Sequence, residues 1–165
     1  MDDAELLRQA GRIVQEAGAR LEDRDRAAQV RAKGPTDFVT AVDTEVQERI
    51  RAQLQALDGT IQFMAEEKDN ASIDPARPVW VLDPVDGTTN LIHGFRHSAI
   101  SLALAEGERV RLGLVYDPFA GELFAARRGG GAFCNGRPIH ASGTVHLADS
   151  LCSVGTNPGR REEAG

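Results

Sequence analysis

The sequence has few cysteines and no long apolar run. Only two of its 165 residues are cysteine. Cys134 and Cys152 form neither a CxxC pair nor a zinc spacing, so we expect both thiols to be reduced and structural. The longest apolar run, 99–105, is interrupted by Ser101 and falls far short of the ~20 residues that a membrane helix needs. The chain begins Met-Asp-Asp, which is unlike a signal peptide. We therefore expect a cytoplasmic protein with no membrane partner.

Basic residues are scarce where acidic residues gather. The formal net charge is −6, and residues 37–86 contain eleven acidic residues against four basic ones. No basic stripe is present that would neutralise the phosphates of a nucleic acid, so we expect no nucleic-acid partner. The carboxylates are expected either to bind cations or to form a solvated face.

Hydrophobic spacing predicts an α+β protein. Apolar residues at helical intervals predict helices over 3–22 and 42–57, and the polar stretch 23–40 between them is expected to be a loop. Two helices followed by hairpin-linked strands are typical of the α+β class. The last three expected strands form an antiparallel meander. The expected strands are 60–64, 79–82, 98–106, 109–117 and 122–127.

The strongest functional signal is the segment 80–90, WVLDPVDGTTN. A buried apolar strand runs into Asp83, and Pro84 biases that residue towards extended backbone, so we expect the strand to end there. Asp86 follows after the turn. The two carboxylates, with the Val85 carbonyl between them, are suited to one hard cation such as Mg²⁺, which prefers oxygen ligands.

An anion site is expected beside this cation site. Gly87, Thr88 and Thr89 would offer backbone N–H groups at a helix start, where anions bind. A cation together with a phosphate is the joint ligand that this pairing favours. The alternative is that the segment is only a turn, because Asp, Pro, Gly and Thr all favour turns.

Two further acidic segments weigh against a plain turn. Glu66 and Glu67 follow the strand expected at 60–64, and Asp43 lies at the start of the second expected helix. The alternatives are a solvated loop pair for the two glutamates and an N-cap for Asp43. Three acidic segments, each at the boundary of an element, favour one shared site.

With these motifs the chain resembles the inositol monophosphatase family of Mg²⁺-dependent, lithium-sensitive phosphomonoesterases. The matching motifs are a lysine before D-x-V-T-x-x-D (Lys33, then 37–43), a Glu-Glu pair after a strand (66–67) and W-[IV]-[IL]-D-P-[IVL]-D-G-T-T-N (80–90). The run 129–136 also resembles the family's meander, so the similarity covers nearly the whole chain. The resemblance implies the layered sugar-phosphatase fold, here its first domain with two helices packed on a mostly antiparallel sheet.

The resemblance also implies the metal ligands. Glu66, Asp83, Asp86 and the backbone carbonyl of Val85 match the family's ligands. They imply two or three Mg²⁺ ions, with Mn²⁺ as a substitute.

Catalytic roles are implied in the same way. Asp43 matches an acid that positions water near the metals, and Thr88 matches the hydroxyl that activates the attacking water together with Glu66. Gly87 and Thr88 match the phosphate-binding backbone. Lys33 matches a lysine on a loop near the metals.

The activity that the resemblance implies is hydrolysis of a small polyol or sugar phosphate monoester, first of all myo-inositol 1-phosphate, by a homodimer. Thr89, Asn90 and Leu91 resemble the inositol phosphatase branch. One alternative is a related phosphatase for fructose 1,6-bisphosphate, histidinol phosphate or a nucleotide 3′-phosphate. Another is a catalytically silent metal-binding fragment.

Two departures from the family pattern affect these expectations. Ala65 stands where the family usually has glycine. The second-domain motif W-D-x-A-[AG]-G, whose aspartate binds metal, is absent, because the single tryptophan is Trp80. We therefore expect residues 1–147 to form an N-terminal metal- and phosphate-binding domain and 148–165 to be the start of a truncated C-terminal α/β domain. The missing aspartate favours the silent fragment.

Overall fold

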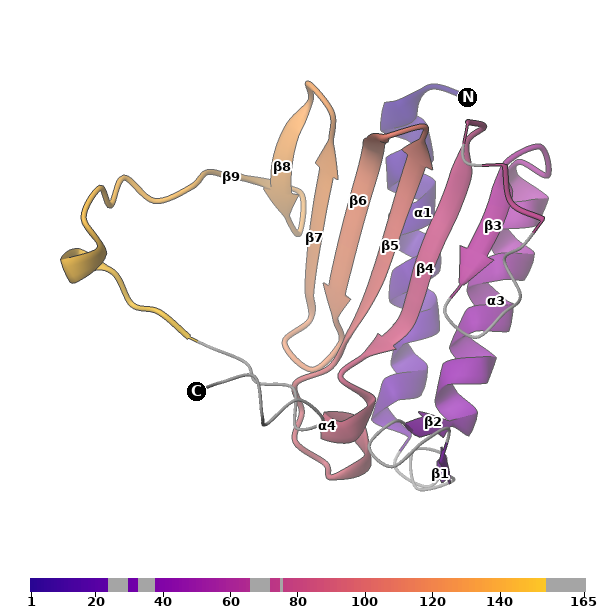
Figure 1. Cartoon of the computed structure of the whole chain (residues 1–165), viewed down its shortest axis with the longest axis horizontal. Helices are drawn as coiled ribbons and strands as arrows, with labels where there is room; N and C mark the ends of the chain where they lie inside the picture. Colours follow the sequence, from indigo (N-terminus) through magenta and orange to yellow (C-terminus); the bar gives the residue numbers. More distant parts are fainter. Residues whose placement is uncertain (24–29, 33–37, 66–71, 75, 154–165) are drawn as a thin grey trace.

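Two long helices cover one face of a seven-stranded sheet in the computed structural model of the chain (Figure 1). The structure describes residues 1–23, 30–32, 38–65, 72–74 and 76–153. Strands follow one another across the sheet in chain order, and every neighbouring pair is antiparallel except the parallel pair β3–β4. This confirms the α+β class. The strands are β3 (Gln62–Ala65), β4 (Val79–Asp86), β5 (Ala99–Glu106), β6 (Arg109–Asp117), β7 (Glu122–Arg127), β8 (Gly131–Cys134) and β9 (Arg137–Ile139).

The first helix, α1 (Asp3–Gly18), begins at a side-chain cap and packs with a regular apolar face. Asp2 is the N-cap, and its Oδ1 accepts a hydrogen bond from the Glu5 backbone N–H at 2.8 Å. The buried positions recur every three or four residues, as expected for one helical face against a sheet. A short 3-10 turn, η1 (Ala19–Glu22), follows where the sequence predicted continued helix. The buried apolar side chains of α1 are Leu6, Ala10, Val14 and Ala17.

The second long helix, α3 (Ala41–Leu57), begins with a capping box. Thr40 is the N-cap, and its hydroxyl accepts from the Val42 and Asp43 backbone N–H groups. Asp43 returns a hydrogen bond to the Thr40 backbone N–H at 2.8 Å. The N-cap alternative for Asp43 is therefore wrong, because Thr40 takes that position and Asp43 completes the box three residues later.

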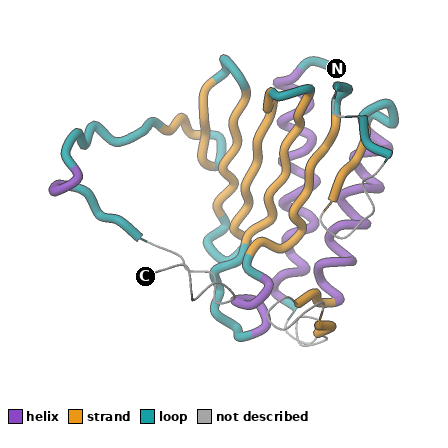
Figure 2. Tube along the Cα trace, in the orientation of Figure 1, coloured by secondary structure: helices purple, strands orange, loops and turns teal. Residues whose placement is uncertain are grey.

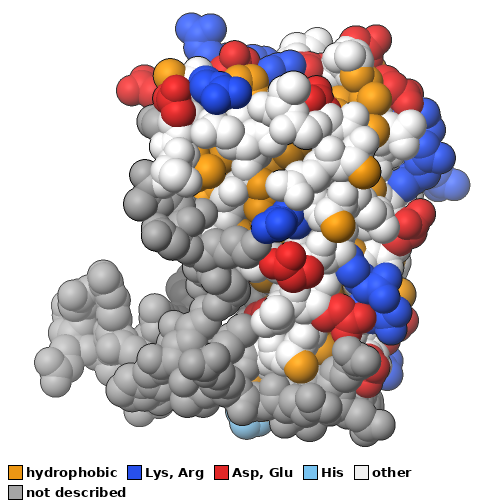
Figure 3. Space-filling view, turned by 90° about the vertical axis from the view of Figure 1, so that its right-hand side faces the viewer, with side chains coloured by type: hydrophobic (Ala, Val, Ile, Leu, Met, Phe, Trp, Pro, Cys, Tyr) orange, Lys and Arg blue, Asp and Glu red, His pale blue; other side chains and the backbone are white. Residues whose placement is uncertain are grey.

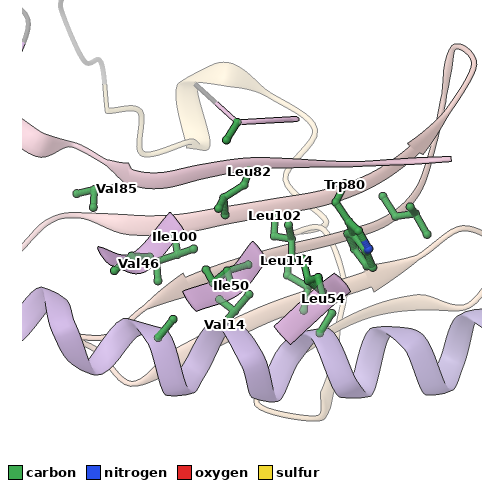
Figure 4. Packing of buried hydrophobic residues seen from close by; sticks show 14 of the residues in the cluster. Val14, Val46, Ile50, Leu54, Trp80, Leu82, Val85, Ile100, Leu102 and Leu114 are labelled. Carbon is green, nitrogen blue, oxygen red and sulfur yellow. The ribbon is translucent and has the colours of Figure 1, made fainter. Parts of the chain in front are cut away.

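The core lies between these helices and the sheet (Figure 4). Trp80, Leu102 and Leu114 extend from the sheet, and Ile50 and Leu54 approach them from α3. Trp80 is only 1% exposed, which confirms the buried apolar strand expected before Asp83.

Two short strands lie where a loop was expected. β1 (Val30–Ala32) and β2 (Phe38–Thr40) pair antiparallel, so the prediction of a loop throughout 23–40 is wrong. The sequence did not indicate these strands, because the stretch is polar and a three-residue strand is too short to show a hydrophobic period.

Strand β4 continues past the predicted end at Asp83 as far as Asp86. Asp83 pairs with Ser101 and Asp86 with Ala99, so three steps along β4 match two along β5. This irregularity accommodates Pro84, which has no N–H to donate to the ladder. The strand thereby delivers both carboxylates to the same end of the sheet.

The other face of the sheet carries no helix of the described chain (Figure 1). Val115 and Phe124 pair with each other on this open face and are 42% and 39% exposed. Beyond β9, residues 140–153 run away from the sheet and contain a 3-10 turn, η2 (Leu147–Asp149) (Figure 2). Val145, Leu147 and Leu151 in this tail are largely exposed.

Both cysteines are free. Cys134 is half-buried on β8, whereas Cys152 is exposed, so the structural role expected for Cys152 is wrong. None of the helices in the described ranges has the length and apolar character that a membrane crossing requires. Acidic and basic side chains mix on the side shown in Figure 3, and neither sign forms a continuous stripe among the described residues there.

Candidate functional site

Three elements meet at one end of the sheet (Figure 1). They are the end of β4, the short helix α4 (Thr88–Ile92) and the start of α3 with its preceding strand β2. Gly87 joins β4 to α4 with a φ of +87°, in the left-handed region that favours glycine. The structure thus brings the motif 80–90 next to the motif that contains Asp43.

A hydrogen bond joins these two motifs directly. Thr88 Oγ1 lies 3.1 Å from Asp43 Oδ1, although the residues are 45 positions apart in the sequence. The same hydroxyl lies 3.0 Å from the Val85 carbonyl oxygen. A threonine hydroxyl has one proton, so these two acceptors share it.

Asp43 is a firmly held carboxylate. It is only 3% exposed, and its other oxygen, Oδ2, accepts from the Thr40 backbone N–H at 2.8 Å and from the Thr40 hydroxyl at 2.5 Å. Both of its oxygens therefore accept hydrogen bonds from the protein. This arrangement suits a residue that orients the Thr88 hydroxyl through a hydrogen bond.

Oxygen donors line the end of β4. Asp83 is half-buried, and its Oδ1 accepts from the Val85 backbone N–H at 3.2 Å. Asp86 is exposed, and the Val85 carbonyl lies between the two carboxylates in the sequence. All three donors are oxygens, which is the chemistry that Mg²⁺ and Mn²⁺ take, so the donor set fits such a cation. Within the described ranges, however, no three His, Cys, Asp or Glu side chains gather closely enough to hold a metal ion.

Some of the predicted site residues lie outside the described part of the chain. Lys33 and Glu66 are among them, as is Glu67. Strand β3 ends at Ala65, which pairs with Leu82 one position before Asp83. The residue directly before Glu66 is therefore placed next to the strand that carries the other predicted ligands.

Two polar side chains to which the sequence analysis gave no structural role hold the Gly87 turn. Ser98 Oγ donates to the Gly87 carbonyl at 2.9 Å, and Asn90 Nδ2 donates to the His97 carbonyl at 2.7 Å. Asn90 lies within the motif, but no local pattern marks Ser98, because its partner is eleven residues away. A hollow beside the turn is lined by Asp86, Gly87, Asn90, His97, Ser98, Ala99 and Asp117.

Comparison with known proteins assigns this arrangement to one family. The profile of the inositol monophosphatase family matches residues 2–164. An inositol-1-monophosphatase of Rhizobium meliloti is 38% identical over 128 residues, which are 78% of this chain and 48% of that protein. The chain spans about half the length of the curated relatives it matches.

Solved structures show the same fold. The extragenic suppressor protein suhB of Bartonella henselae superposes with a TM-score of 0.75 at 33% identity, over 81% of this chain and 53% of that one. An IMPase/NADP phosphatase complexed with NADP and Ca²⁺ gives a TM-score of 0.73 at 30% identity, over 87% of this chain and 57% of its own.

Proposed function

Because the chain belongs to the inositol monophosphatase family, we propose that its protein is a Mg²⁺-dependent phosphatase for a small polyol or sugar phosphate monoester, first of all myo-inositol 1-phosphate. The observation that carries the proposal is the Thr88–Asp43 hydrogen bond at 3.1 Å. It joins two family motifs that are remote in sequence, with the oxygen donors of β4 beside them.

The residues proposed to hold the metal are Asp83, Asp86, the Val85 carbonyl and Glu66. The first three supply only oxygen atoms at the end of β4, which supports Mg²⁺ or Mn²⁺ as the cation, and the number proposed, two or three ions, is the one that the family resemblance implies. Bound there, the metal would supply a Lewis acid that polarises the phosphate and lowers the pKa of water.

The chain's own residues are proposed to hold the reactants. The Thr88 proton points to Asp43 or to the Val85 carbonyl, which leaves oxygen lone pairs of Thr88 to accept a hydrogen bond from the attacking water. Glu66 would hold the same water from its other side, in line with phosphorus. The backbone of Gly87 and Thr88 would hold phosphate oxygens, and Lys33 would lie on a loop near them.

We also propose that residues 1–147 form the first of two domains and that 148–165 begin a second, α/β domain. The open sheet face supports this proposal, because an exposed apolar patch commonly marks an interaction surface. Val115 and Phe124 on that face are substantially exposed, as is Leu151 in the tail. A cytoplasmic homodimer is the assembly that the family resemblance favours.

Two alternatives remain to be separated by experiment. The neighbour described as an IMPase/NADP phosphatase favours testing a nucleotide phosphate beside the sugar phosphates. The half-length of the chain relative to its relatives favours testing for a fragment that binds metal without turnover.

The first test measures phosphate release from myo-inositol 1-phosphate, fructose 1,6-bisphosphate and NADP, each with and without Mg²⁺. We expect turnover that requires Mg²⁺, is fastest on the inositol ester and falls at least about 100-fold in Asp86→Asn, because one ligand oxygen is lost. The 165-residue chain and a longer protein that includes the second domain are assayed in parallel.

The pattern of results distinguishes the proposed phosphatase from the two alternatives. Turnover only in the longer protein would identify the chain as an incomplete enzyme. A faster reaction on another ester would make that ester, and not myo-inositol 1-phosphate, the preferred substrate. Absence of turnover in both chains, on all three esters, would contradict the phosphatase proposal.

A further inference from the structure

Ser98 is a buried hydroxyl that the proposed function leaves unused. It is 4% exposed and lies directly before β5, and its Oγ donates to the Gly87 carbonyl at 2.9 Å. We infer that Ser98 is a positioning residue, which orients the Gly87–Thr88 peptide so that its N–H faces the phosphate of the substrate. This inference rests on the proposed function, because that function places the phosphate at this peptide.

The argument begins with the geometry of one peptide unit. The structure contains no cis peptide bond among its described residues. In a planar trans peptide the carbonyl and the N–H point in opposite directions, so fixing one fixes the other. The Gly87 oxygen accepts from Ser98 Oγ and also from the Leu91 backbone N–H at 3.1 Å. The Thr88 N–H therefore points away from both Ser98 and the interior of α4.

This N–H is available to a ligand. No acceptor in the described part of the chain takes the Thr88 N–H. The neighbouring Thr88 hydroxyl is directed towards Asp43 and Val85. Ser98 thus holds the Gly87–Thr88 peptide through the Gly87 carbonyl, and Asp43 holds the Thr88 side chain through its hydroxyl.

Gly87 itself cannot fix the orientation of the Gly87–Thr88 peptide. A Cβ at this position would lie 2.9 Å from the His97 carbonyl oxygen, and the φ of +87° is strained for any other residue. Glycine is required, but it is also the residue with the greatest backbone freedom. Helix α4 adds little, since it has five residues and is a little over one turn long. The hydrogen bonds from Ser98 to the Gly87 carbonyl and from Asn90 to the His97 carbonyl therefore connect the turn to the segment directly before β5.

An isosteric pair of variants tests the role of the hydroxyl. Ser98→Thr keeps the hydroxyl, whereas Ser98→Val replaces it with a methyl group of similar volume, so both variants make the same change in packing. Two quantities are measured on the 165-residue chain. The first is the ¹³C chemical shift of the Gly87 carbonyl without ligand, and the second is the Kd of inorganic phosphate with Mg²⁺. Trp80 fluorescence reports that both variants are folded.

We expect Ser98→Thr to keep the carbonyl shift and the phosphate Kd within about twofold of the parent. We expect Ser98→Val to move the carbonyl shift and to weaken phosphate binding about five- to tenfold, the worth of one hydrogen bond. Equal phosphate affinity in the two variants would overturn the inference, and so would a carbonyl shift that is the same in both. If the parent chain binds no phosphate with Mg²⁺, the proposed phosphate site itself is overturned in this chain, and the role of Ser98 falls with it.

Discussion

At the scale of single residues, two glycines of α1 face the sheet and differ in how closely neighbouring side chains approach them. A Cβ on Gly18 would lie 2.5 Å from Tyr116 Cε1, in the rigid ring. A Cβ on Gly11 would lie 3.1 Å from Leu123 Cδ2, at the end of a flexible side chain. The sheet-facing side of α1 is therefore more tightly packed at its C-terminal end.

We expect Gly18→Ala to lower the free energy of unfolding by about 1–3 kcal/mol through overpacking, although alanine is the better helix former. Gly11→Ala is the matched control and should change it by less than about 1 kcal/mol, because Leu123 can shift. Urea denaturation followed by Trp80 fluorescence measures both. Equal effects would mean that Tyr116 moves aside as readily as Leu123.

At the scale of one element, the start of α3 combines a helix cap with a site residue. Thr40 is only 2% exposed, and its hydroxyl caps the helix and donates to Asp43 Oδ2 at 2.5 Å. Asp43 then accepts from Thr88. The cap therefore links the stability of α3 to the orientation of the Thr88 hydroxyl.

We expect Thr40→Val to lower the free energy of unfolding by about 1–2 kcal/mol, the usual cost of a lost N-cap. Thr40→Ser keeps the hydroxyl and should cost less than half as much. Equilibrium urea unfolding of the two variants gives the comparison. A serine variant as unstable as the valine variant would show that the methyl group of Thr40, not its hydroxyl, stabilises this end of the helix.

At the scale of the whole molecule, the sheet has one covered face and one open face. Leu102 on β5 points into the helix layer and is 1% exposed, whereas Val115 on β6 lies on the open face and is 42% exposed. The two faces should therefore respond differently to the loss of side-chain volume.

Leu102→Ala is expected to lower the free energy of unfolding by about 2–5 kcal/mol, and Val115→Ala by less than about 1 kcal/mol. Chemical denaturation of the 165-residue chain tests both. In a longer protein whose second domain covers the open face, the cost of Val115→Ala should rise. A cost for Val115→Ala near that of Leu102→Ala in the short chain would mean that the open face is already covered, for example by a second copy.

The sequence by itself determined the features that depend on local pattern. The apolar stripes of α1 and α3 and the hairpins of β5, β6 and β7 follow from periodicity and turn residues, which act over a few positions. The motif at 80–90 likewise indicated oxygen donors beside a glycine turn, because those residues are adjacent in the chain.

Only the tertiary structure decided which remote segments meet. It paired β3 with β4 in parallel, carried β4 past Pro84 to Asp86, and brought Thr88 to Asp43 and Ser98 to Gly87. None of these contacts leaves a local signal, since each joins residues that are separated by many positions in the sequence. The chemical groups of the candidate site therefore follow from one contiguous motif, whereas the residues that hold those groups in place are identified only by the tertiary structure.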